Sequence, residues 1–172
     1  MKKVSFLFII VYLMLINFVY AEAEVPCGTA EAIRAFWVGK KLIRPEPGPE
    51  YIYTTHFVIH YATSGPHQTT RDYAESVAVY AEYCWAKQID SLGWIEPPPD
   101  GNAGGDSRYD IYIRMMGDTM GVAVPESHYP TPYPGGATSY IKIRAGLSWN
   151  KLRAVVAHEF NHASQHRYNA LA

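Results

Sequence analysis

The sequence is poor in cysteine and carries no concentration of charge of either sign. Cys27 and Cys84 are its only cysteines, and because no CxxC pair exists we do not expect a zinc site built from them. The formal net charge is -1 and no block of like charges occurs. A general nucleic-acid-binding protein needs a basic surface that displaces counterions, so we expect no nucleic-acid partner.

The one long apolar run of the sequence lies at its N-terminus. Lysines precede the apolar residues 4–19, and small residues follow at Val19 and Ala21, where a signal peptidase would recognise them. An uncleaved membrane anchor is the alternative, but the run is short for a hydrocarbon core ~30 Å thick. We predict a signal peptide over residues 1–21, cleaved after Ala21 or Ala23. The protein would then be secreted or extracytoplasmic, without membrane contact after cleavage.

Both cysteines lie after this N-terminal segment. An even number of cysteines in an exported protein indicates a disulfide. We therefore predict a bridge between Cys27 and Cys84 that ties the mature N-terminus to the helix carrying Cys84. Two buried free thiols are the alternative.

The remaining sequence has the composition of one globular domain, with 48% hydrophobic and 18% charged residues. Alternation of apolar and polar residues predicts strands, and apolar residues at steps of three and four predict helices. The fold class is therefore α+β, with a mixed sheet packed against two long helices, one of which comes last in the chain. The predicted strands are 55–61, 109–115, 121–124 and 139–144, the predicted helices are 30–38, 69–92 and 148–168, and 125–137 is a predicted surface loop.

The strongest motif is His158-Glu159-Phe160-Asn161-His162 in the last predicted helix. Residues four apart lie on one helix face, so the imidazoles of His158 and His162 can bind one zinc ion. Glu159 points about 100° further round and can act on water at the metal as general base and acid without being a ligand. The alternative is a pair of helical histidines without metal. His166 is too far along the axis to join them, and we expect it to be solvated.

A second candidate for metal binding is the glycine-rich stretch from Asp100 to Asp106. Its oxygen-bearing side chains stand at alternate positions and could hold calcium. It is not an EF-hand loop, because Ile111 occupies the twelfth position. We favour a plain glycine turn before a strand.

Residues 154–162 resemble the active-site helix of zincin metallopeptidases. The mature chain resembles secreted bacterial metalloproteases of the gluzincin type, and the matching stretches are 55–61, 104–110 and 156–162. This resemblance implies a zincin-like fold, zinc at His158 and His162, and Glu159 as the catalytic acid and base. It also implies an edge strand that binds an extended peptide substrate by strand addition. Our candidate for that strand is Ser139–Arg144, with Tyr140, Ile141 and Lys142 at the substrate.

The third zinc ligand is missing from the pattern, although a catalytic zinc uses three protein ligands and water. Metzincins place a histidine six residues after the second one, where this chain has Tyr168. Gluzincins take a glutamate from a helix further downstream. We therefore expect the third ligand beyond residue 172, and residues 24–172 to be the N-terminal part of a metallopeptidase catalytic domain that is weakly active or inactive alone.

The sequence thus predicts a secreted zinc-dependent endopeptidase acting on peptides or proteins. The alternative function is a non-catalytic exported binding or adhesion module that retains the zincin-like helix. A catalytic base beside the metal ligands favours the enzyme, because a structural zinc site has no need of one. The sequence gives no oligomeric state.

Overall fold

The computed structural model describes residues 26–129 and 135–170, so the predicted signal peptide lies outside the described residues. No helix in the described ranges is both long and apolar enough to span a bilayer. The elements are α2 (Thr29–Trp37), β1 (Glu50–Tyr53), β2 (Phe57–Tyr61), α3 (Arg71–Trp85) with a π-helical continuation over Ala86–Ser91, β3 (Tyr109–Arg114), β4 (Gly121–His128), β5 (Ala137–Arg144) and α4 (Trp149–Tyr168).

The five strands form one mixed sheet in the order β1-β2-β3-β5-β4. The central strands β2, β3 and β5 are parallel, whereas β1 and β4 pair antiparallel at the two ends of the sheet. The prediction of an α+β fold with a mixed sheet is therefore confirmed. Strand β1 was not predicted, and β4 continues to His128 through part of the stretch predicted as a loop.

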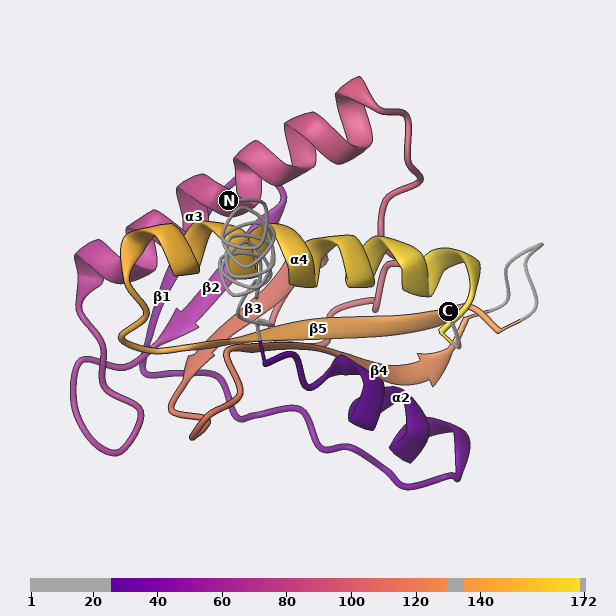
Figure 1. Cartoon of the computed structure of the whole chain (residues 1–172), viewed down its shortest axis with the longest axis horizontal. Helices are drawn as coiled ribbons and strands as arrows, with labels where there is room; N and C mark the ends of the chain where they lie inside the picture. The colour runs from indigo at the N-terminus through magenta and orange to yellow at the C-terminus, as the bar shows by residue number, and fades with distance from the viewer. Residues whose placement is uncertain (1–25, 130–134, 171–172) are drawn as a thin grey trace, which may run out of the picture.

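Helices α3 and α4 cover one face of the sheet, and α2 covers part of the other (Figure 1). Thr70 caps α3 by accepting a hydrogen bond from the Tyr73 backbone N–H at 3.2 Å. In α4 five apolar residues are buried, because steps of three and four keep them on one face. They are Leu152, Val155, Val156, Phe160 and Ala163.

The predicted substrate strand is an interior strand, so its assignment as an edge strand is wrong. Strand β5 pairs with β3 on one side and with β4 on the other, and strand addition needs a free edge. Tyr140 and Lys142 line a cavity on the α2 side of the sheet, whereas Ile141 packs under α3 and α4. The edge strand next to α4 is β4.

Candidate metal centre

Helix α4 presents His158 and His162 side by side. Their Nε2 atoms lie 3.1 Å apart and their ring centroids 4.6 Å apart. His158 is exposed and His162 is half-buried. Two nitrogen ligands at about 2.0 Å from a tetrahedral zinc ion are separated by about 3.3 Å, so the spacing suits a shared ion.

The side-chain amide of Gln165 contacts His162 Nδ1 and leaves His162 Nε2 available to coordinate a metal ion. His162 Nδ1 lies 2.8 Å from Gln165 Oε1. An amide oxygen only accepts hydrogen bonds, so Nδ1 carries the proton and Nε2 keeps its lone pair. Zinc-binding histidines commonly have such an outer partner, which fixes the tautomer and the ring orientation.

Cys27 supplies a third donor that the sequence analysis did not expect at this site. Its sulfur lies with the histidine nitrogens in a group whose ligand atoms are all within 4.8 Å of one another. Thiolate and imidazole are both good zinc ligands, so the donor set fits zinc. In the absence of metal, burial raises the pKa of the Cys27 thiol.

The predicted disulfide is wrong, because Cys27 and Cys84 are both free. Cys84 lies on the buried face of α3, in the same core cluster as Val77 and Ala81, and burial raises the pKa of its thiol to about 11. Cys27 instead lies at the α4 histidines. The two cysteines therefore serve different parts of the molecule.

Backbone pairing with β4 holds Cys27 in place. The Met120 N–H donates to Pro26 O at 2.8 Å, and the Gly28 N–H donates to Gly121 O at 2.9 Å. Cys27 and Gly121 thereby form a parallel bridge. Pro26–Gly28 thus lies along the start of β4 as a short added strand.

Glu159 lies beside the histidines but is fully buried. Its Oε2 accepts a hydrogen bond from Thr29 Oγ1 at 2.9 Å and lies 3.7 Å from Cys27 Sγ. Its Oε1 is buried without a hydrogen-bond partner among the described residues. The carboxylate also needs a glycine opposite, because a Cβ on Gly121 would lie 2.6 Å from Oε1.

Contacts in the structure bear on two further expectations, one for His166 and one for the loop Asp100–Asp106. His166 is 1% exposed, so the expectation that it is solvated is wrong. The aspartates of the candidate calcium loop are already engaged: Asp100 pairs with Arg44 at 2.5 Å and Asp106 with Arg108 at 2.8 Å. The loop turns on glycines with positive φ, including Gly101 and Gly104, which supports the plain glycine turn.

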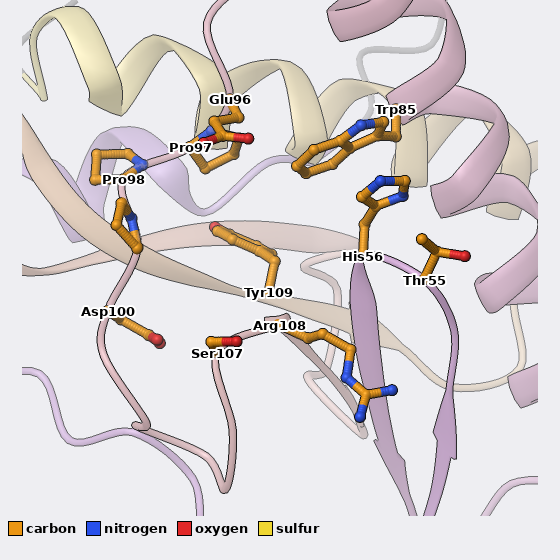
Figure 2. A pocket seen from close by; sticks show the side chains of 11 residues that line it. Thr55, His56, Trp85, Glu96, Pro97, Pro98, Asp100, Ser107, Arg108 and Tyr109 are labelled. Atoms are coloured by element: carbon orange, nitrogen blue, oxygen red, sulfur yellow. The ribbon is translucent and has the colours of Figure 1, made fainter.

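A separate cavity of about 220 Å³ lies between the end of α3 and the loops that precede β3 (Figure 2). His56 and Trp85 stack in its wall with ring centroids 4.0 Å apart, and His56 Nδ1 contacts Glu82 Oε2 at 2.7 Å. None of the residues that line the cavity belongs to the group of Cys27, His158 and His162. The cavity therefore lies outside the metal centre.

Comparison of the chain with protein-family models, with curated proteins and with solved structures gave no match. The candidate metal centre accordingly rests on its own geometry alone. His158, Glu159 and His162 follow from a local motif, but Cys27 lies 132 positions before Glu159. In the sequence, Cys27 could have been singled out only as a cysteine that has no second cysteine at a metal-binding spacing.

Proposed function

We propose that this chain belongs to an exported, zincin-like zinc endopeptidase. The observation that carries the proposal is the pair of histidine Nε2 atoms 3.1 Å apart on α4, with the Glu159 carboxylate beside them. The mixed sheet under α4, with an antiparallel edge strand next to that helix, is compatible with a zincin-like arrangement.

Each residue of the site has a role in peptide hydrolysis. His158 and His162 would hold zinc, and a bound zinc ion would supply Lewis-acid activation. Glu159 would accept a proton from the attacking water at a carboxylate oxygen and deliver it to the leaving amine nitrogen. Gln165 orients His162. The expected further ligand beyond residue 172 stays a prediction.

The substrate strand of this proposal is β4 in place of β5. One edge of β4 pairs with β5, and Pro26–Gly28 pairs along the opposite edge at Gly121. An extended peptide added at that position would lie beside Glu159, because Gly121 adjoins the carboxylate. Strand addition recognises the peptide backbone and tolerates many side chains, which suits an endopeptidase acting on proteins.

The first test measures zinc content after dialysis. We expect His158→Ala and His162→Ala to lose zinc that the unmodified protein retains. His67→Ala is the matched control, because His67 is an exposed histidine whose ring contacts the Met115 backbone instead. Zinc retention that does not depend on either α4 histidine would refute the metal site.

The second test separates the enzyme from the binding module. In the protein expressed from its complete coding sequence, Glu159→Gln should keep zinc and lose hydrolysis of an unfolded protein by about a hundredfold or more, because the amide cannot accept a proton. If the zinc-loaded protein shows no proteolysis, or if the Glu159→Gln variant cleaves as fast as the unmodified protein, the exported binding or adhesion module is favoured.

A further inference from the structure

The segment Pro26–Thr29 contacts three parts of the candidate site: the start of β4, the Glu159 carboxylate and the pair of α4 histidines. We propose that it is a built-in inhibitor: the Cys27 thiolate binds the zinc held by His158 and His162, and the segment keeps the site closed until it is displaced. This inference rests on the proposed function, because it gives that same site its regulation.

The backbone contacts of the segment imitate those of a bound extended peptide. Pro26 O accepts a hydrogen bond from Met120, and the Gly28 N–H donates to Gly121 O. These are the backbone groups at the start of the edge strand β4, on the side away from β5. A substrate cannot pair there while Pro26–Gly28 does, because each backbone group is already bonded.

The side chains of the segment engage the chemical groups of the site. Thr29 Oγ1 donates to Glu159 Oε2 at 2.9 Å and accepts from the Ala123 N–H at 2.9 Å. Glu159 is 0% exposed where Thr29 contacts it on one side and Gly121 adjoins it. A general base in this position cannot reach a water molecule or a leaving amine, since both require an opening to the reacting atoms.

Cys27 completes the closure at the metal. Its sulfur lies in the same group of ligand atoms as the two histidines, and a thiol that binds zinc releases its proton to solvent. A sulfur ligand takes a coordination position that a catalytic zinc otherwise keeps for water or substrate. Displacement of the segment frees this position and uncovers Glu159 in one movement.

The direct test is a cobalt spectrum, because cobalt substituted for zinc gives a thiolate-to-metal charge-transfer band only when sulfur is a ligand. We expect the band in the unmodified full chain and its loss in Cys27→Ala. Cys84→Ala is the matched control and keeps the band, since Cys84 is buried in the core. Cys27→Ala should also weaken zinc binding at least about tenfold, because even the loss of an outer partner does so.

The outcomes distinguish the two proposals. Cobalt that binds through His158 and His162 without a thiolate band, or with a band that survives Cys27→Ala, overturns the inference and leaves the proposed zinc site intact. Metal binding that does not depend on the two histidines overturns the proposed function, and the inference falls with it.

A binding measurement tests the closure itself. At saturating zinc, a peptide hydroxamate should bind Cys27→Ala on the order of tenfold or more tightly than Cys84→Ala, because apparent affinity scales with the open fraction of the protein. In the Cys84→Ala protein, zinc should also slow alkylation of Cys27 compared with chelator. Equal hydroxamate affinities would show that the segment does not close the site.

Discussion

Thr29 is the residue through which the N-terminal segment reaches the glutamate of the HExxH motif. Thr29 is 1% exposed, and its hydroxyl joins two elements that are distant in sequence, since it binds both the Ala123 N–H on β4 and Glu159 on α4. One hydroxyl can accept and donate at the same time, so both partners are satisfied by a single side chain. Loss of that oxygen leaves two buried polar groups without their partner.

We therefore predict that Thr29→Val lowers the free energy of unfolding by about 1–3 kcal/mol, because valine keeps the shape but leaves buried groups unpaired. Chemical denaturation of the metal-free protein measures this change. Thr29→Ser is the control, since it retains the hydroxyl and should recover most of the loss. Equal stabilities for the valine and serine variants would mean that the hydroxyl contributes nothing.

At the scale of elements, the close approach of α4 to β4 depends on Gly121. A Cβ at this position would lie 2.6 Å from Glu159 Cγ and 2.7 Å from Val155 Cγ1, closer than real Cβ contacts allow. The absence of a side chain thus brings the helix that carries the motif against the edge strand. This contact sets how closely α4 approaches the sheet beside the candidate metal centre.

Gly121→Ala should destabilise the protein by about 1–3 kcal/mol, because the added methyl group overpacks the contact and pushes α4 away. Thermal or chemical unfolding measures the cost. In a double-mutant cycle with Val155→Ala, which removes one of the clashing atoms, the combined cost should be smaller than the sum of the single costs. If the costs of the two substitutions simply add, the contact between residue 121 and Val155 is not the source of the destabilisation.

The elements were predictable where their signals are local. Apolar residues at steps of three and four predicted helices over 69–92 and 148–168, and these correspond to α3 with its π-helical continuation and to α4, whose buried face holds Leu152, Val155 and Phe160. The order of the strands was not predictable, because it depends on which distant backbones pair. Strand β5 has the alternation of an ordinary half-buried strand, and only its pairing on both sides shows that it is interior.

The candidate site also contains residues that local spacing predicted and one residue, Cys27, that it did not. His158, Glu159 and His162 are held together by one helical turn, so sequence spacing alone predicted the spacing of the histidines. Cys27 reaches them through hydrogen bonds to β4, and no pattern within either segment encodes that pairing. The inferred disulfide failed because the number of cysteines says nothing about where each one lies.

At the scale of the whole molecule, the buried His166 makes stability depend on pH. Burial, followed by the neighbouring His162, lowers the pKa of His166 from 6.5 to about 4. Both ring nitrogens are buried without a partner among the described residues. The unfolded chain therefore binds a proton more readily than the folded chain between these two values, and acidification favours unfolding.

We predict that this contribution is fully present above about pH 7 and is lost as the pH falls from 6.5 to about 4, with a total of about 3 kcal/mol. Denaturation at several pH values, with a chelator present so that metal release plays no part, measures the slope. His166→Leu removes the titrating group and should flatten the profile over this range. If stability falls equally with pH in the unmodified protein and in His166→Leu, His166 is not the group responsible.

The pairing of Pro26–Gly28 with the start of β4 also bears on how separate copies of the protein behave. An exposed strand edge offers unpaired N–H and C=O groups to any neighbouring chain and promotes aggregation. Here the chain's own N-terminal residues satisfy Met120 and Gly121. Displacement of this segment would free these groups and leave the start of β4 open to pairing with another copy of the chain.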